Sequence, residues 1–227
     1  MNVRQIRVYR DLMGENDRWA QETRSLLRSN RVFMLNLIGS PGSGKTTLLE
    51  TMVEPLRERF RFAVLEGDIE TTRDAERLHE LDVPVSQLLS GGACHLEAKL
   101  VHKAVKDLDL QGLDVVFVEN VGNMVCPAEF DVGEHAKVAV LSVTEGEDKP
   151  LKYPLLYREA KAAVLTKTDL LPYLKFDLVA CQGHIRQVNA DLPVFAVSAD
   201  SGAGIGDWMT WVADQALDSA STLSAIR

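Results

Sequence analysis

The feature that most constrains the fold is a glycine-rich segment, residues 39–46, with the sequence GSPGSGKT. It directly follows a nearly continuous apolar run, residues 32–38, and precedes an amphipathic stretch, residues 48–56. The pattern G-x-x-x-x-G-K-[S/T] between a strand and a helix wraps a phosphate chain with backbone N–H groups, and the helix N-terminus adds positive charge. An ordinary glycine-rich turn does not need every position of this pattern. The segment therefore predicts a phosphate-binding loop.

The residues of this loop have predicted parts in holding a nucleotide. Lys45 is expected to reach the β and γ phosphates, and the Thr46 hydroxyl is expected to bind Mg²⁺. The predicted nucleotide-binding residues of the loop are Gly39, Ser40, Pro41, Gly42, Ser43, Gly44, Lys45, Thr46 and Thr47.

Further apolar runs follow along the chain and alternate with amphipathic stretches. Continuous apolar runs are typical of strands that are buried on both faces of a parallel sheet. The later predicted strands are residues 62–65, 115–118, 138–143, 163–166 and 194–197. Because strands and helices alternate, right-handed crossovers are favoured. We therefore expect an α/β fold of the P-loop NTPase type, with a doubly wound, mainly parallel sheet flanked by helices.

The composition argues against several classes of protein. The 25 Lys and Arg residues against 33 Asp and Glu residues give a net charge of −8, which argues against a nucleic-acid partner. No apolar run approaches the ~20 residues of a membrane span, and the N-terminus carries charges where a signal peptide needs an apolar stretch. Three cysteines are too few for a disulfide framework. We expect a soluble, cytoplasmic protein that binds neither membrane nor nucleic acid.

Two acidic residues stand at the ends of predicted strands, where α/β sheets collect their ligands. Asp68 follows the second strand and is expected to face Mg²⁺ or the attacking water, the alternative being a helix cap ahead of Thr71. Glu119 ends the strand 115–118 and is expected to hold the hydration shell of Mg²⁺. The predicted magnesium residues are therefore Thr46, Asp68 and Glu119.

The loop after this strand is predicted to sense the γ-phosphate, because the Gly122 N–H is expected to meet it. In the familiar form of this loop the acid is Asp and a Gln follows the Gly, whereas this chain has Glu119 and Asn123. Asn is one methylene shorter than Gln, so we expect slow intrinsic hydrolysis. The predicted catalytic residues are Lys45, Asp68, Glu119 and Gly122.

The segment TKTD after a predicted strand indicates which base is bound. The Asp169 carboxylate can accept from both N1–H and the N2 amino group of guanine, and adenine has neither donor. The aliphatic stem of Lys167 can cover the base plane. Thr166 stands where the related Asn-Lys-x-Asp pattern has Asn. Ser198 and Ala199 follow the last strand, where a backbone N–H can meet the guanine carbonyl. The predicted substrate is GTP.

Domain boundaries follow from these motifs. Residues 1–30 are expected to form a helical appendage, with a helix from about residue 15 to residue 29. Residues 31–218 form the predicted GTPase domain, and residues 219–227 lack periodicity and are expected to be a frayed tail.

Three soft ligands lie near these loops. Cys94 and His95 follow a Gly-Gly pair and precede an amphipathic stretch, and Cys126 lies four positions beyond Gly122. Thiolates and imidazole suit Zn²⁺, Ni²⁺ or Cu⁺ and do not suit Mg²⁺, but three donors are one short of a closed tetrahedral site. The alternative is that both cysteines are buried small hydrophobes. Cys181 lies in an amphipathic stretch and is expected in the core.

The motifs GSPGSGKT, EGD, GGACH, ENVGNMVCP and TKTD occur in this order. Together they resemble the hydrogenase nickel-incorporation GTPases, the HypB family of the SIMIBI class, over residues 31–211. The resemblance implies a GTP-hydrolysing metallochaperone that assists nickel insertion into [NiFe]-hydrogenase. It also implies a nucleotide-dependent homodimer that shares a nickel or zinc site built from Cys94, His95 and Cys126. The implied partners are a HypA-type zinc metallochaperone and, indirectly, the hydrogenase large subunit.

The chain departs from some members of this family. No cysteine precedes Cys94 and no His-rich tract occurs, so an N-terminal nickel site is not expected. Lys99 stands where some relatives have a second His. A related urease-type nickel GTPase is a competing interpretation, but its Cys-Pro-His motif is absent, because Ala128 follows Pro127. A small-molecule P-loop kinase and a metal-binding regulator without catalysis also compete.

Overall fold

The apolar run that precedes the phosphate loop forms β1, the central strand of a seven-stranded sheet. The computed structural model describes the backbone of residues 3–224 and the side chains of residues 13–219. All strand pairs in the sheet are parallel, and the strand order is β3-β2-β4-β1-β5-β6-β7. The strands are β1 (Phe33–Ile38), β2 (Phe62–Asp68), β3 (Val85–Leu89), β4 (Val115–Glu119), β5 (Ala136–Ser142), β6 (Ala162–Thr166) and β7 (Val194–Ala196).

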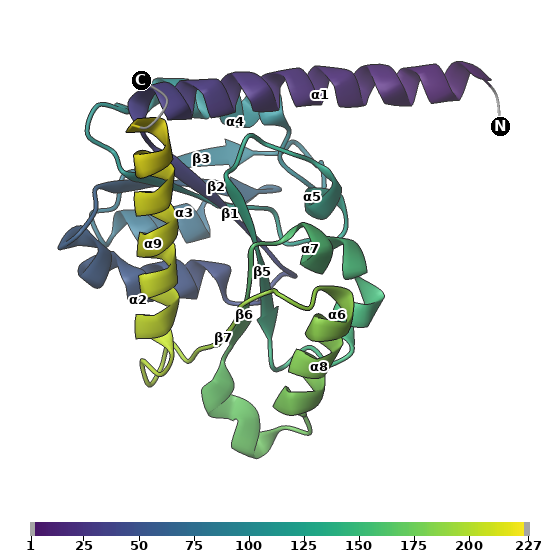
Figure 1. The fold of residues 1–227 in the computed structure, drawn as a ribbon, viewed down its shortest axis with the longest axis vertical. Helices are drawn as coiled ribbons and strands as arrows, with labels where there is room; N and C mark the ends of the chain where they lie inside the picture. Colours follow the sequence, from purple (N-terminus) through teal and green to yellow (C-terminus); the bar gives the residue numbers. More distant parts are fainter. Residues whose placement is uncertain (1–2, 225–227) are drawn as a thin grey trace.

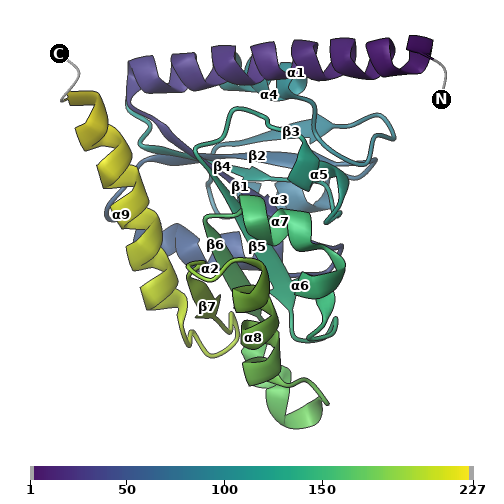
Figure 2. The same ribbon diagram turned by 45° about the vertical axis from the view of Figure 1, so that its right-hand side comes forward.

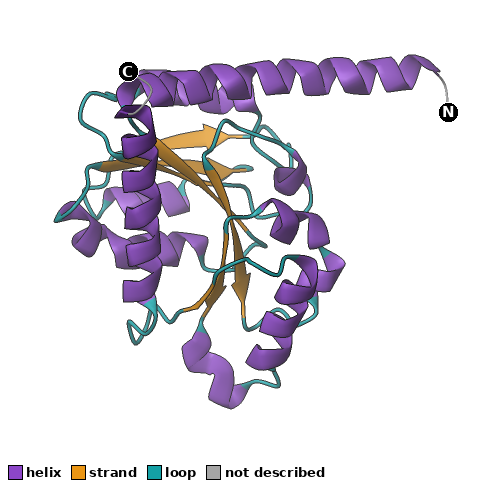
Figure 3. Cartoon of the chain, in the orientation of Figure 1, coloured by secondary structure: helices purple, strands orange, loops and turns teal. Residues whose placement is uncertain are grey.

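Helices cover both faces of this sheet, as Figure 3 shows by its colours. The helices are α1 (Val3–Asn30), α2 (Lys45–Arg57), α3 (Arg73–His79), α4 (Ala98–Asp107), α5 (Cys126–Glu129), α6 (Lys149–Lys152), α7 (Pro154–Glu159), the 3₁₀ helix η1 (Thr168–Tyr173), α8 (Leu178–Val188) and α9 (Ile205–Ser224). α2 and α9 pack against one face, while α1 and α4 cover part of the other and α7 and α8 cover the rest (Figures 1 and 2).

The core follows the alternation of side chains along the strands. In β1, Phe33 and Leu35 point into the cluster under α2 and α9, whereas Met34 points into the cluster under α1 and α4. A strand that is apolar on both faces therefore needs a helical layer on each side. This arrangement confirms the predicted fold class.

The structure corrects the predicted elements at three places. No apolar run revealed β3, whose residues Val-Ser-Gln-Leu-Leu mix polar and apolar side chains because β3 lies at the edge of the sheet. The predicted domain end at residue 218 falls inside α9, which continues to Ser224, so residues 219–224 are helical and do not form a frayed tail. Residues 225–227 of that predicted tail lie outside the described part of the chain. The first helix is longer than predicted, from Val3 to Asn30.

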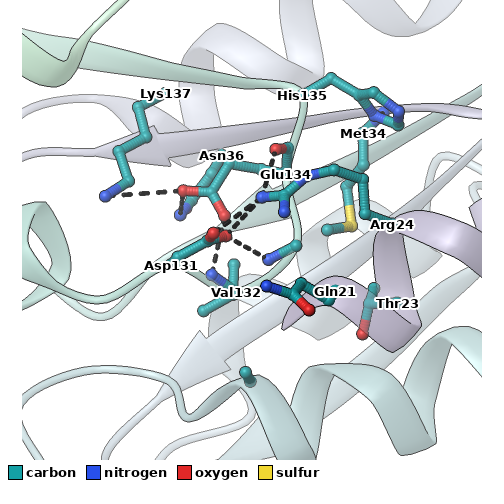
Figure 4. Close-up of polar contacts among 12 residues, drawn as sticks. Gln21, Thr23, Arg24, Met34, Asn36, Asp131, Val132, Glu134, His135 and Lys137 are labelled. Atoms are coloured by element: carbon teal, nitrogen blue, oxygen red, sulfur yellow. Dashed lines mark hydrogen bonds and ion pairs between the residues drawn. The ribbon is translucent and has the colours of Figure 1, made fainter. Parts of the chain in front are cut away.

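Polar contacts fasten α1 to the body of the molecule. The Asn16 amide donates to the Asp131 carbonyl at 2.8 Å. The Arg24 guanidinium contacts both Asp131 carboxylate oxygens at 2.7 and 2.8 Å (Figure 4). The Thr23 hydroxyl lies 3.1 Å from Nδ1 of His102 on α4. These contacts place α1 along α4, next to the loop that follows α5.

His135, in the same network, is predicted to make the fold sensitive to acid. Its Nδ1 accepts the Met34 N–H at 3.0 Å, which requires the neutral ring (Figure 4). Burial, reinforced by Arg24 and Arg28, lowers the pKa of His135 to about 4. Because the unfolded chain takes up this proton near pH 6.5, stability is lost as the pH falls from about 6.5 towards 4. We expect His135 to account for about 2 kcal/mol between about pH 7 and pH 5.

Urea unfolding at the two pH values measures this loss. The control is His135→Gln, which removes the titrating ring and is expected to lose about 2 kcal/mol less than the wild type over the same interval. An equal loss in both proteins would show that His135 does not cause the acid sensitivity.

In the described part of the chain, no helix has the length and apolar character of a membrane span.

Candidate nucleotide and metal sites

The phosphate loop connects the carboxyl end of β1 to the first turn of α2. Gly42 and Gly44 have φ angles of 74° and 89°, the left-handed region that favours glycine. The loop carbonyls of Gly39 and Ser40 lie 3.4 and 3.5 Å from the Lys45 Nζ atom. Burial lowers the pKa of Lys45, whereas the nearby Glu119 carboxylate opposes this shift. The predicted loop therefore curls around the buried ammonium group of Lys45.

Glu119 and Thr46 come together beside this loop. The Thr46 hydroxyl donates to Glu119 Oε1 at 2.7 Å. The other carboxylate oxygen, Glu119 Oε2, is buried and has no hydrogen-bond partner among the described residues. Burial raises the pKa of Glu119 to about 7. A hydroxyl and an unpartnered carboxylate oxygen are ligands that Mg²⁺ accepts, so these residues fit the cation that the family implies.

Asp68 is held by hydrogen bonds within the turn that follows β2. Its Oδ1 accepts from the backbone N–H groups of Ile69 and Glu70, and its Oδ2 accepts from the Thr71 hydroxyl at 2.6 Å. Although burial opposes the shift, these hydrogen bonds lower the pKa of Asp68. The carboxylate therefore organises the turn after β2, and the N-cap position of α3 belongs to Thr72. The alternative interpretation had Asp68 cap the helix. In the structure Asp68 instead stabilises the turn that precedes α3.

Glu66, two residues earlier on β2, was not among the predicted site residues. It is only 2% exposed and pairs in register with Glu119 on β4. Burial, with Glu119 beside it, raises the pKa of Glu66 to about 8. Its carboxylate lies within 4.8 Å of those of Asp68 and Asp74. The sequence held one signal, because side chains two residues apart in a strand point to the same face and Asp68 was already a candidate.

The Gly122 segment lies against the phosphate loop. A Cβ atom added to Gly122 would be 2.8 Å from Pro41 Cγ and 3.0 Å from its Cα, so no larger residue fits without displacing the loop. Asn123 points elsewhere: its amide donates to the Cys94 carbonyl at 3.1 Å, and its Oδ1 accepts the Val125 N–H at 3.0 Å. Asn123, which the sequence offered for positioning water, therefore connects the loop that carries Cys94 to the segment that leads to Cys126.

The TKTD segment is tied to the phosphate loop by two hydrogen bonds. The Thr166 hydroxyl donates to the Ser43 carbonyl at 2.6 Å, and the Lys167 ammonium donates to the Gly42 carbonyl at 2.7 Å. Lys167 itself has a φ angle of 60°. Thr166, in the position that the related pattern gives to Asn, thus joins the TKTD segment to the predicted phosphate loop.

Asp169 lies in an open groove of about 820 Å³ next to the phosphate loop. The Ser198 hydroxyl donates to Asp169 Oδ1 at 2.6 Å and so orients the carboxylate. The Ser198 N–H donates to the Ala203 carbonyl at 2.9 Å, which leaves the Ala199 N–H as the candidate in this loop for the guanine carbonyl. Ala199 lines the groove and carries the neighbouring N–H. The groove is lined by Thr47, Glu50, Thr51, Arg77, Glu80, Leu81, Lys167, Asp169, Leu170, Ala199 and Asp200.

The three predicted soft ligands come together at one place. The Cys94 and Cys126 sulfur atoms are 2.8 Å apart, and Cys94 Sγ is 3.8 Å from His95 Nδ1. Cys94 and His95 lie in the irregular loop before α4, and Cys126 begins α5. The neighbouring Cys94 thiol raises the pKa of Cys126, and burial lowers the pKa of His95, whose ring stacks on Phe130. Thiols and a neutral imidazole form a donor set for a soft or intermediate metal ion.

Leu96 attaches this metal loop to the ends of two strands. A Cβ added to Gly67, between Glu66 and Asp68, would be 2.7 Å from Leu96 Cδ1. The Leu96 N–H lies 3.4 Å from the Asn120 side-chain oxygen, next to Glu119. Leu96, the residue after His95, therefore contacts β2 and the residue that follows β4.

Comparison with known proteins agrees with these motifs. The family model described as "CobW/HypB/UreG, nucleotide-binding domain" matches residues 33–196. The hydrogenase maturation factor HypB of Azotobacter vinelandii is 51% identical over 213 residues, which are 93% of this chain and 70% of that protein. The HypB of Escherichia coli K12 is 45% identical over 212 residues, 93% of this chain and 73% of that protein.

A solved structure of HypB from Helicobacter pylori in complex with nickel is also similar. Its TM-score is 0.86 at 33% sequence identity, and the similarity covers 91% of this chain and 97% of that one. Since both the family model and these relatives span most of the chain, the chain belongs to the CobW/HypB/UreG family and, within it, to the HypB hydrogenase maturation factors.

Proposed function

We propose that this protein is a GTP-hydrolysing nickel metallochaperone that assists nickel insertion into [NiFe]-hydrogenase. Metal binding would be coupled to the nucleotide state and to dimerisation. The observation that carries the proposal is the attachment of the metal loops to the nucleotide loops. Asn123 binds the Cys94 carbonyl while its neighbour Gly122 contacts the phosphate loop. The names of the relatives, a hydrogenase maturation factor and a nickel-bound structure, support the same function.

The nucleotide chemistry follows from the residues beside the phosphate loop. Lys45 would reach the β and γ phosphates, and the Asp169 carboxylate, oriented by Ser198, would select guanine. Thr46 and Glu119 would hold Mg²⁺, which would neutralise phosphate charge. The Gly122 N–H would meet the γ-phosphate. We propose slow intrinsic hydrolysis, because the Asn123 side chain is already engaged away from the attacking water.

Coupling to the metal follows from the same contacts. Release of the γ-phosphate would free Gly122, and Asn123 and Cys126 follow it within one short loop. On the other side of the cluster, Leu96 would transmit movement of Gly67 to His95. Allosteric coupling of this kind is typically ~1–3 kcal/mol, or ~5–150-fold in affinity, and it is reciprocal.

A homodimer would complete the metal site. One protomer contributes the three donors Cys94, His95 and Cys126, and the exposed Cys94 is accessible to a second copy. Two protomers would supply six donors, enough for Ni²⁺ or Zn²⁺. We propose a HypA-type zinc metallochaperone as partner and the hydrogenase large subunit as the indirect recipient, in the cytoplasm.

Nickel titration in two nucleotide states tests the proposed function. The protein is titrated with Ni²⁺ once with GDP and once with a non-hydrolysable GTP analogue and Mg²⁺. We expect the affinity or the number of ions per protomer to differ, with an affinity ratio of ~5–150-fold. Identical curves would contradict the coupling. Tighter binding of ATP than of GTP would favour a small-molecule kinase instead.

A further inference from the structure

Glu66 is a buried acid whose local contacts leave one carboxyl oxygen unsatisfied. It is 2% exposed, and its Oε2 has no hydrogen-bond partner in the described part of the chain. A buried polar group without a partner costs about 1–3 kcal/mol, and more when it is charged. An acid retained at such a position indicates a ligand that compensates for this cost.

The side chains around Glu66 indicate what kind of ligand this is. Glu119, its register partner on β4, points to the same face of the sheet, and its own Oε2 is also unpartnered among the described residues. Asp68 and Asp74 place carboxylate oxygens within 4.8 Å of that of Glu66. Lys45 brings a positive charge to this cluster. Asp74 already pairs with Arg77 at 2.9 Å, so the oxygens left for a divalent cation and its water are the unpartnered ones of Glu66 and Glu119.

The donor chemistry separates this cluster from the nickel site. All its donors are oxygens, which suit Mg²⁺, whereas nickel suits the thiols and imidazole of the other cluster. Mg²⁺ also keeps several water molecules when it binds to proteins, and buried carboxylates accept hydrogen bonds from such water. Asp68 is already engaged by its own turn, but Glu66 Oε2 is available for this purpose.

We propose that Glu66 is a positioning residue of the magnesium centre, where its carboxylate holds the water shell of the cation bound by Thr46 and Glu119. This inference rests on the proposed function, because the cation binds there together with the guanine nucleotide. Outer-shell partners of a metal typically contribute about 10–100-fold to its affinity. Glu66 therefore makes nucleotide binding depend on Mg²⁺ without contacting the nucleotide.

The test measures GDP affinity of the whole chain with and without Mg²⁺, using a fluorescent GDP analogue. For Glu66→Gln we expect the Mg²⁺-dependent gain in affinity to shrink about tenfold. Affinity without Mg²⁺ is expected to stay equal or to rise, because glutamine keeps the size of the side chain and cannot carry a negative charge near the phosphates. The matched control is Glu70→Gln, an exposed acid in the following loop, which is expected to keep the full gain.

Each outcome decides between distinct possibilities. An unchanged gain in Glu66→Gln would overturn the inference, and it would also be the result if Glu66 acted only on the hydrolytic step. A purely structural role would lower affinity equally with and without Mg²⁺, and this too would overturn it.

If Glu66→Gln does not fold, Glu66→Asp keeps the carboxyl group but withdraws it by one methylene. We then expect a gain reduced by about threefold, and an unchanged gain would overturn the inference. A wild-type protein without any Mg²⁺-dependent gain would instead overturn the proposed GTPase chemistry, and the inference with it.

Discussion

Replacing Cys126 with alanine is expected to weaken Ni²⁺ binding by at least about 100-fold while GTP affinity stays unchanged. Loss of an outer-shell partner already costs a metal site about 10–100-fold, and Cys126 would supply a direct ligand. Its sulfur lies 2.8 Å from that of Cys94, so its removal takes one of two adjacent thiols from the cluster. GTP affinity is expected to persist, because Gly122 and not Cys126 contacts the phosphate loop.

Cys181→Ala is the matched control for this experiment. Cys181 is also a free thiol, but it lies on the buried face of α8 in the core, as its place in an amphipathic stretch predicted. This variant should bind Ni²⁺ like the wild type. Titrations need a reducing agent, since oxidation of the adjacent Cys94 and Cys126 thiols would imitate the loss of a ligand. Equal Ni²⁺ affinity in Cys126→Ala and the wild type would remove Cys126 from the site.

Replacing Asp169 with asparagine is expected to lower GTP affinity by about 10²–10⁴-fold without damaging the fold. The carboxylate would accept two hydrogen bonds, from N1–H and from the N2 amino group of guanine. Hydrogen bonds to a charged group contribute about 1.5–3 kcal/mol each, and the asparagine amide would set a donor against a donor. The groove is open, and the Ser198 hydroxyl can still donate to the asparagine side-chain oxygen, so the local structure should persist.

Xanthosine nucleotides provide the rescue for this variant. Xanthine carries an oxygen where guanine has the N2 amino group, so the amide of the introduced asparagine can donate to it. We expect Asp169→Asn to prefer xanthosine triphosphate, which the wild type should bind weakly. The control is Asp200→Asn, which removes an exposed carboxylate from the rim of the same groove and should leave GTP affinity unchanged. Unchanged base selectivity in Asp169→Asn would overturn the guanine assignment.

Local patterns were sufficient to predict much of the fold. A buried strand, a glycine loop and a helix succeed one another within residues 32–57, and short-range sterics and hydrogen bonding dictate such a unit. Six of the strands were visible as apolar runs because most of their residues pack between two helical layers. The edge strand β3 was missed because only one of its five residues is buried, so its sequence needs no continuous apolar run.

As with the fold, some features of the candidate site follow from the local sequence, and others follow only from contacts between distant segments. Chain order alone placed Lys45 and Thr46 on the phosphate loop, and the residue types of Cys94, His95 and Cys126 indicated a soft metal. Residue types and local spacing carry this information, because a ligand's chemistry belongs to its side chain.

Other properties depended on which segments pack together. Only the register between β2 and β4 sets Glu66 beside Glu119, and only the turn geometry engages the Ser198 N–H and the Asp68 carboxylate. The attachment of the metal loop through Leu96 likewise depends on the close approach of Gly67. Some of these contacts join residues that are far apart in the chain. Others occupy hydrogen-bond donors and acceptors whose partners the sequence does not reveal. A pattern of residue types does not encode them, because they arise only when the sheet and its loops are assembled.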